Sequence, residues 1–339
     1  MNTLPLTLLD CTLRDGGYYT DWQFDEGLVC EYLAACGTIG IDALEIGYVR
    51  LDEGEGGPYG RLSARLPECV TNALRLQPKK LAVMFDAKAA LKLQPADAAN
   101  QLREKIRAVP GDVSILRVAV NYAQFEPLAE FMENLSRSDL KVSVNLMQID
   151  IAPDHAIKGC IAVAQRLPSL AAVYLADSLG SMLPERVSQL VGEFCRRLPQ
   201  AIGFHAHDNQ GLALHNSLTA LHAGATWIDG TMFGMGRGAG NAKTENLIPV
   251  LRGSSAECVS LNRMLARHFL PLWETHRWGP SVYYGIAGAA KIHPTYVQQL
   301  EVHAGIKALS KIEVLKILTD AHATSYSPDV LQNALRSVA

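Results

Sequence analysis

The sequence lacks three features that would each define a class of protein. Its seven cysteines include no CxxC pair, which argues against a disulfide framework and against a thiolate zinc site. No apolar run reaches the roughly 18 residues needed to span a bilayer. Neither sign of charge dominates, because 31 Lys and Arg residues stand against 34 Asp and Glu residues. We therefore expect no membrane span and no nucleic-acid partner.

Two further absences concern the compartment. The N-terminus, MNTLPLTLLD, has neither a basic start nor a cleavage site, so we expect no signal peptide. Scattered thiols are typical of a reducing compartment, and we predict a cytoplasmic protein. What the sequence does have is length, since 339 residues, 48% of them hydrophobic, suffice for one large core with or without a smaller domain.

Short apolar runs rich in β-branched residues recur along the chain. Eight of them lie at 6–13, 43–49, 80–87, 114–121, 141–148, 171–178, 201–208 and 225–232. Near-continuous apolar strands that alternate with amphipathic stretches predict a parallel sheet covered by helices. Eight such units close a (β/α)₈ TIM barrel, and 1–252 is a usual length for one. An open doubly wound sheet is the alternative.

Residues 253–339 change character and predict a C-terminal α-helical appendage that covers or flanks the barrel mouth. Within it, Ser310 and Glu313 form a capping-box pattern. Ser327 followed by Pro328 predicts a helix start. The long polar segment 50–64, after the second strand, is interpreted either as a lid or as a surface loop.

Polar residues gather at the carboxyl ends of the predicted strands, where barrel active sites form. His205 and His207 are two apart in a strand, so their side chains share a face. Together with Asp15, at the end of the first strand, they predict a two-histidine, one-carboxylate metal site with open positions. A pair of hydrogen-bonded core histidines is the alternative. The other polar residues at these ends are Arg14, Glu45, Asp86, Arg117, Asn145, Gln148, Asp177 and Ser178.

A glycine-rich segment, GMGRGAGNAKTENL (234–247), follows the eighth strand. Its glycines let backbone amides approach a ligand closely, so a phosphate or carboxylate near the next helix is one interpretation. A plain glycine-rich connection is the other. No acidic residue is placed to bind a ribose, so this is not a dinucleotide-binding fingerprint.

Three motifs in order carry a family resemblance. TLRDGG after the first strand, HAHDNQGLA on the seventh and GMGRGAGNAKTEN after the eighth together resemble the metal-dependent lyase and synthase barrels. That family includes 4-hydroxy-2-oxovalerate aldolase, 3-hydroxy-3-methylglutaryl-CoA lyase and 2-isopropylmalate synthase. The resemblance implies Asp15, His205 and His207 as ligands of a divalent metal and Asn241 as a further ligand or support. It also implies that Arg14 faces a developing enolate oxygen.

The resemblance implies a divalent-metal aldolase that cleaves or forms a bond between the enolate of a 2-oxo acid, such as pyruvate, and an aldehyde. Nitrogen and oxygen ligands suit Mn²⁺ or Mg²⁺, with Co²⁺ or Zn²⁺ as alternatives. The alternative functions are a Claisen-type acyl-CoA synthase, an HMG-CoA-lyase-like enzyme and a non-catalytic metal-binding barrel subunit. An aldehyde dehydrogenase partner is also implied, and we expect a homo-oligomer.

One position departs from the aldolase pattern. Those aldolases carry a catalytic histidine three residues after the metal-binding aspartate, whereas this sequence has Tyr18 there. A phenol ordinarily loses its proton only near pH 10, so either Tyr18 is tuned or another group carries the proton. His293, in the C-terminal segment, is the second candidate. The residues predicted to bind substrate are Glu45, Arg117, Asn145, Lys291 and Tyr296.

Overall fold

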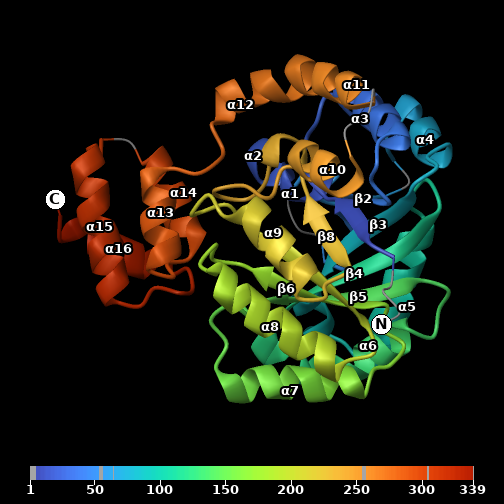
Figure 1. Ribbon diagram of the computed structural model, residues 1–339, viewed down its shortest axis with the longest axis horizontal. Coiled ribbons are helices and arrows are strands. Elements are labelled where there is room, and N and C mark those ends of the chain that lie inside the picture. The colour runs from blue at the N-terminus through green and yellow to red at the C-terminus, as the bar shows by residue number, and fades with distance from the viewer. Residues whose placement is uncertain (1–4, 53–55, 64, 254–256, 304, 339) are drawn as a thin grey trace.

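A computed structural model describes residues 5–52, 56–63, 65–253, 257–303 and 305–338. Eight parallel strands pair in sequence order and close on themselves (Figure 1). This confirms the predicted (β/α)₈ TIM barrel. The strands are β1 (Thr7–Asp10), β2 (Ala43–Tyr48), β3 (Lys80–Asp86), β4 (Val113–Asn121), β5 (Lys141–Met147), β6 (Ala172–Asp177), β7 (Ala201–Ala206) and β8 (Trp227–Gly230).

Helices connect the strands and form the outer layer of the barrel (Figure 1). Asp25 caps the first long helix by accepting a hydrogen bond from the Leu28 amide. Pro95 and Pro184 each stand at the start of a helix, where the missing amide hydrogen costs nothing. The helices and helical turns up to the end of the barrel are α1 (Thr12–Asp15), α2 (Gly17–Thr20), α3 (Glu26–Thr38), α4 (Glu68–Arg75), η1 (Ala87–Lys92), α5 (Pro95–Arg107), η2 (Tyr122–Gln124), η3 (Glu126–Leu128), α6 (Ala129–Leu135), α7 (Asp154–Gln165), α8 (Pro184–Arg197), α9 (Ala213–His222), η4 (Met232–Gly234) and α10 (Thr244–Arg252).

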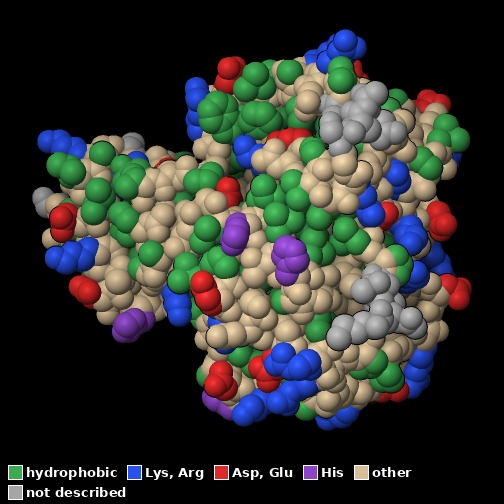
Figure 2. All heavy atoms as spheres, viewed as in Figure 1, with side chains coloured by type: hydrophobic (Ala, Val, Ile, Leu, Met, Phe, Trp, Pro, Cys, Tyr) green, Lys and Arg blue, Asp and Glu red, His purple; other side chains and the backbone are tan. Residues whose placement is uncertain are grey.

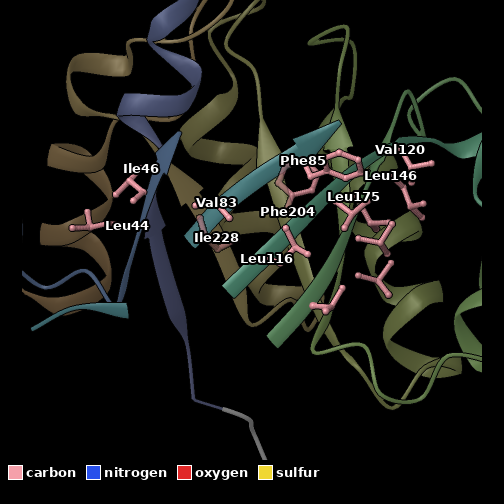
Figure 3. Packing of buried hydrophobic residues seen from close by; sticks show 14 of the residues in the cluster. Leu44, Ile46, Val83, Phe85, Leu116, Val120, Leu146, Leu175, Phe204 and Ile228 are labelled. Carbon is pink, nitrogen blue, oxygen red and sulfur yellow. The ribbon is translucent and has the colours of Figure 1, made fainter. Parts of the chain in front are cut away.

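The main hydrophobic core lies between the strands and these helices. Outward-facing residues of every strand contribute to it, and Figure 3 shows several, among them Leu44, Val83 and Leu116. Burying one such side chain fully stabilises the fold by ~1.5–3 kcal/mol. Because the strands are also covered on their inner face, their sequences are apolar almost throughout.

The inside of the barrel has two layers of different chemistry. The layer nearer the amino ends of the strands is apolar and includes Leu9, Ala43, Ala82 and Ile115. Two residues further along, the inward positions become polar, with Glu45 and Arg117 fully buried. Alternate residues of a strand share a face, so Ala43 and Glu45 of β2, and Ile115 and Arg117 of β4, point into the barrel. The polar layer forms the floor of the barrel mouth.

The helices that follow the barrel form two groups (Figure 1). The first group joins the main core through Leu261 and Phe269. The second surrounds a core of its own and forms a lobe beside the barrel. The predicted domain boundary after residue 252 remains a prediction. The helices are α11 (Glu257–Met264), the π-helix η5 (Leu265–Phe269), α12 (Leu270–His276), α13 (Val282–Ala289), α14 (Pro294–Val302), α15 (Ala308–Asp320) and α16 (Pro328–Arg336).

The two predicted helix starts in the lobe have different outcomes. Ser327 caps α16, and its hydroxyl accepts a hydrogen bond from the Val330 amide, which confirms that start. The capping box at Ser310 is wrong. Helix α15 already begins at Ala308, and the preceding Lys307 makes no side-chain cap.

The surface of the molecule carries charges of both signs. Figure 2 shows acidic and basic side chains interspersed over one face, in keeping with the net charge of −3. Within the described residues, no helix is long and apolar enough to cross a membrane.

Residues 53–55 and 64 of the predicted lid or loop lie outside the described residues. The described part packs on β2, where Tyr48 and Tyr59, and Leu62 and Tyr48, form backbone hydrogen bonds of 2.8 Å.

Candidate active site

The chain turns sharply where β1 ends, and this turn brings Arg14 and Asp15 to the barrel mouth. Asp10 accepts hydrogen bonds from the amide and hydroxyl of Thr12, at 3.0 and 2.6 Å, and from the Tyr32 hydroxyl at 2.6 Å. These bonds hold the helical turn α1 directly on the end of the strand. Arg14 and Asp15 are therefore buried residues of α1, whereas the sequence had predicted them at the end of the strand itself.

Three residues predicted to bind metal converge at the mouth. One donor atom each from Asp15, His205 and His207 lie within 4.8 Å of one another. Nε2 of His205 is 3.5 Å from Oδ2 of Asp15. The side-chain amide of Asn241 donates to the same carboxylate oxygen, and its own carbonyl oxygen is buried without a hydrogen-bond partner among the described residues. Asn241 thus orients Asp15 and offers a further oxygen.

The two imidazoles are oriented by partners behind them. Nδ1 of His205 is 2.8 Å from Oδ2 of Asp229, and Nδ1 of His207 is 2.8 Å from the backbone carbonyl of Asp177. A carbonyl oxygen only accepts, so His207 carries its proton on Nδ1 and presents the lone pair of Nε2. Metal-binding histidines usually have partners of this kind. With the free oxygen of Asn241, this nitrogen and oxygen donor set fits a divalent metal ion.

A chain of buried charges runs beneath the pocket. Nε of Arg14 donates to Glu45 at 2.7 Å, and Nη1 donates to Asp15 at 2.6 Å. Arg117 pairs with the same Glu45 oxygen at 3.1 Å and with Asp229 at 2.5 Å. Buried charges are tolerated only when they are paired and hydrogen-bonded. Each charge in this chain has a partner of opposite sign.

These charges set the ionisation of two of the donors. Burial would raise the pKa of Asp15, but the Arg14 guanidinium and a hydrogen bond from His205 outweigh it and hold that pKa well below its usual range. Burial lowers the pKa of His207 to about 3, with help from the positive charges of His205 and Arg237. At neutral pH the carboxylate is therefore ionised and His207 is neutral, as metal ligands must be.

His205 stands between two carboxylates. Burial lowers its pKa, but the hydrogen bonds to Asp15 and Asp229 outweigh burial and raise the pKa above its usual value. A proton and a metal ion therefore compete for Nε2 of this histidine.

Another part of the pocket wall is aromatic, and its packing requires a glycine at position 17. The hydroxyls of Tyr18 and Tyr48 are 3.2 Å apart. Trp22 packs edge-on against both rings, and its indole nitrogen donates to the Arg14 carbonyl at 2.7 Å. The indole lies so close to Gly17 that a Cβ there would be 2.1 Å from it. Gly17 thus lets Trp22 pack against both tyrosines and donate its hydrogen bond to the Arg14 carbonyl.

The two walls enclose a cavity of about 70 Å³. Arg237 is half-buried there; its guanidinium donates to the Ser178 carbonyl at 3.3 Å and forms no ion pair with a carboxylate among the described residues. The cavity thus holds a guanidinium that is free to meet an anion. The lining residues are Arg14, Asp15, Tyr18, Tyr48, Met84, Ala119, Asn145, Met147, Ala176, Ser178, His205, His207 and Arg237.

Two of the predicted substrate-binding residues lie beneath this cavity. Glu45 and Arg117 are fully buried and are absent from its lining. Arg117 also stacks on a ring, with Cζ 4.3 Å from the centroid of Tyr174. Their contacts are with other protein charges, so the geometry gives them a supporting position and not one against a substrate. Asn145 does line the cavity.

The three predicted residues of the C-terminal segment also lie outside the lining. Tyr296 is buried in the core of the lobe, where its hydroxyl donates to the Ser325 carbonyl at 3.0 Å. His293 begins α14, and its ring accepts a hydrogen bond from the Thr295 amide. Lys291 occupies an exposed turn with φ of 58°. The lobe thus packs beside the mouth and leaves these groups outside the inner cavity.

Sequence reasoning missed Tyr48 and Arg237. Alternation along β2 turns Glu45 inward and would turn Tyr48 outward. The pairing with β3 shifts register between these two residues, at Gly47 with φ of 147°, and this shift turns Tyr48 into the cavity. Arg237 lies in the glycine-rich segment 234–247, where the prediction of a ligand site rests on the glycines and not on the arginine. For Asp229, also missed, the available signal was a charge inside an apolar strand.

The fold is that of a (β/α)₈-barrel enzyme, a class in which active sites form at the carboxyl ends of the strands, where this cavity lies. The chain belongs to the HMGL-like family, whose model matches residues 5–266. It is 30% identical to an oxaloacetate decarboxylase of Mycobacterium tuberculosis over 76% of this chain and 73% of that protein. It is 32% identical to a 4-hydroxy-2-oxovalerate aldolase of Pelotomaculum thermopropionicum over 73% of this chain and 70% of that protein.

Solved structures agree with this assignment. The N-terminal domain of a proposed aldolase from Bacteroides vulgatus matches with a TM-score of 0.76 and 30% identity, over 88% of this chain and 97% of that one. The carboxyl transferase domain of Rhizobium etli pyruvate carboxylase matches with a TM-score of 0.70 and 17% identity, over 99% of this chain and 61% of that one. At that identity the second likeness shows the fold alone.

Proposed function

We propose that this protein is a divalent-metal-dependent aldolase that joins the enolate of pyruvate to an aldehyde, or cleaves the product. The observation that carries the proposal is the group formed by Asp15, His205 and His207 beside the Arg14 guanidinium. Relatives named 4-hydroxy-2-oxovalerate aldolase support it. Mn²⁺ or Mg²⁺ suits the donor set best.

The charged wall would hold the metal and stabilise the enolate. Asp15, His205 and His207 are the ligands, and the free oxygen of Asn241 faces the same point. When bound, the ion supplies Lewis-acid stabilisation of the ketone oxygen as it becomes an enolate. Arg14 shares this task, because its Nε and Nη1 are anchored while Nη2 makes no hydrogen bond to the described residues. A donor held in advance costs no reorganisation during the reaction.

The carboxylate of the 2-oxo acid has a natural partner in Arg237. Its guanidinium lines the cavity and has no carboxylate of its own among the described residues. Guanidinium groups bind carboxylates through two parallel hydrogen bonds. Selection of 2-oxo acids over simple ketones follows from this contact.

We assign the proton transfer to Tyr18. Its hydroxyl is 3.2 Å from that of Tyr48, and 41% of its surface is exposed, so the proton has a path to solvent. His293 is the weaker candidate. It lies outside the cavity, and burial lowers its pKa to about 3, with help from the charges of Arg237 and Lys88. A base of that pKa is poorly matched to neutral pH.

Replacing Tyr18 tests this assignment. Tyr18→Phe removes the hydroxyl and keeps the ring against Trp22, so we expect the rate of enolisation to fall about 100-fold with little change in stability. Tyr19→Phe is the matched control, because that hydroxyl donates to the Gly238 carbonyl and does not line the cavity. Equal rates for the two variants would mean that a group other than Tyr18 transfers the proton.

Deuterium exchange into the methyl group of pyruvate tests the proposed function itself. We expect exchange in D₂O with Mn²⁺, measured by NMR after chelation of the metal, and loss of exchange without metal. Asp15→Ala should lower the rate by about 1,000-fold or more, because both the metal and the partner of Arg14 are affected. Asp112→Asn, an exposed aspartate before β4, is the control. A wild-type protein that catalyses no exchange would rule out pyruvate as the nucleophile.

The similarity to an oxaloacetate decarboxylase supports a second candidate. Loss of CO₂ from oxaloacetate releases the same enolate, so the same residues serve both reactions. Pyruvate formation from oxaloacetate, compared with condensation of pyruvate with a panel of aldehydes, separates the two. Release of free thiol from acetyl-CoA would instead favour a Claisen-type synthase. Co-purification with an aldehyde dehydrogenase tests the proposed partner. Light scattering measures the mass in solution and tests the expected homo-oligomer.

A further inference from the structure

A second cavity lies at the rim of the mouth, outside the aldolase site. Its volume is about 420 Å³, against about 70 Å³ for the inner cavity. Apolar walls with a few charged groups, in a cavity of this size, are typical of small-molecule sites. The lining residues come from the ends of β2 and β3 and from η1: Val49, Arg50, Leu51, Asp52, Phe85, Asp86, Lys88, Ala89, Lys92 and Leu93.

A residue that lines the outer cavity contacts a residue that lines the inner one. Tyr48 lines the inner cavity. Arg50 lines the outer one and lies over the Tyr48 ring, with Cζ 5.0 Å from the centroid. Nε of Arg50 is anchored on the Gly60 carbonyl at 2.8 Å, which holds the guanidinium in this place. Arg50 of the outer cavity therefore stacks directly on Tyr48 of the inner one.

The charges of the outer cavity are unbalanced. Arg50, Lys88 and Lys92 stand against two carboxylates, and none of the three cations forms an ion pair among the described residues. Asp86 is already engaged, since it accepts a hydrogen bond from the Lys88 amide at 3.0 Å. The charge of Lys88 reaches the mouth, where it lowers the pKa of His293 after the larger effects of burial and of an arginine.

We propose that the outer cavity binds the far end of the aldehyde acceptor, and that this end carries a carboxylate or a phosphate on an apolar chain. The inference rests on the proposed aldolase function. The small inner cavity takes the reacting carbons, and the rest of the acceptor passes Tyr48. Leu51 and Leu93 contact its chain, and the unpaired cations meet its anion.

Acceptor discrimination tests the proposal. With the Mn²⁺ enzyme and pyruvate, kcat/KM is compared for succinic semialdehyde against pentanal, and for glyceraldehyde 3-phosphate against glyceraldehyde. We expect a preference of about tenfold or more for one or both anionic aldehydes, as for hydrogen bonds to charged groups. The Lys88→Gln, Lys92→Gln double variant should lose most of that preference. Lys105→Gln removes an exposed lysine of α5 outside the cavity and should keep it.

Deuterium exchange into pyruvate needs no acceptor, so it separates the two possible failures. Exchange without any preference for anionic aldehydes overturns the acceptor proposal and leaves the aldolase standing. A preference that survives in the double variant, with thermal unfolding equal to wild type, overturns it as well. Absence of exchange in the wild type overturns both the aldolase and the acceptor proposal.

Discussion

Two pairs of buried carboxylates lie in or near the candidate metal site, and their protonation is controlled in opposite ways. Asp15 and Asp229 each face an arginine, and although burial would raise their pKa values, these arginines hold them below the usual range. Asp150 and Asp177, beyond β5 and at the end of β6, face no arginine. Burial raises the pKa of Asp150 to about 6, and burial with the neighbouring charge of Asp150 raises the pKa of Asp177 to about 8.

The comparison shows that burial alone does not decide the charge of a carboxylate. A cation within ion-pair distance reverses the effect of desolvation. In the group with arginines, Asp15 offers an ionised oxygen to the candidate metal site, and Asp229 orients His205. The group without them serves the scaffold: Asp177 accepts the amides of Ser181 and Met182, Asp150 accepts the Ser181 hydroxyl, and the Asp177 carbonyl orients His207.

The largest effect on stability should come from removing Arg117, the cation that Glu45 and Asp229 share. Arg117→Leu leaves Glu45 and Asp229 buried without it, so we expect the free energy of unfolding to fall by about 3–5 kcal/mol. Urea denaturation measures this. Arg137→Leu is the control, because the pair of Arg137 with Glu133 is exposed and should contribute about 0.5 kcal/mol or less. Similar losses for both variants would contradict the distinction between buried and exposed pairs.

A smaller effect, on metal binding, is expected at the carboxylate behind His205. Asp229→Asn removes the charge and keeps an oxygen near Nδ1, so Mn²⁺ affinity should fall about 10–100-fold, as for other residues that orient metal ligands. Isothermal titration calorimetry measures it. Gln200→Leu removes buried hydrogen bonds to the Ala164 and Leu167 carbonyls, before β7 and away from the donor residues, and it should leave the affinity near wild type. Equal losses would mean that Asp229 acts only through general stability.

The smallest effect concerns the group without arginines and depends on pH. The folded protein keeps the proton of Asp150 up to about pH 6, whereas the unfolded chain loses it near the ordinary value of 3.8. The stabilising contribution of this proton is therefore complete below about pH 4 and is lost as the pH rises through 6. Asp150→Asn removes this titration and also the charge that raises the pKa of Asp177, and both changes should stabilise the variant relative to wild type, by about 1–2 kcal/mol or more, as the pH rises from 5 to 7.5.

Unfolding at the two pH values tests this expectation. Asp139→Asn, on an exposed turn away from Asp150 in the sequence, provides the reference. A difference for Asp150→Asn that is constant with pH would mean that the folded and unfolded states hold this proton alike.

Much of the fold was predictable because barrel strands are covered on both faces. Each strand is a short apolar run that a single sequence displays, and eight of them at regular spacing leave few architectures. The convergence of the three candidate donors was predictable for a similar reason. Asp15, His205 and His207 are polar residues at the ends of such runs, and the two histidines share a face by strand parity alone.

The supporting residues could not be read in the same way. Glu45 and Arg117 stand at strand positions that face the barrel axis, and whether such a residue meets a substrate or another charge depends on its height in the barrel. Tyr48 faces the cavity because the register shifts at Gly47. Registers between strands arise from packing across the whole barrel, and no local pattern carries them.

The sequence by itself thus determined the barrel and indicated the three residues of the candidate metal site, because apolar periodicity and the side-chain alternation of a strand are local properties. The tertiary structure alone decided which carboxylates are ionised, which arginine faces the cavity and which tyrosines share a hydrogen bond. Those properties depend on distances between residues from different strands, such as the 2.5 Å between Arg117 and Asp229. Such distances exist only once the barrel has closed.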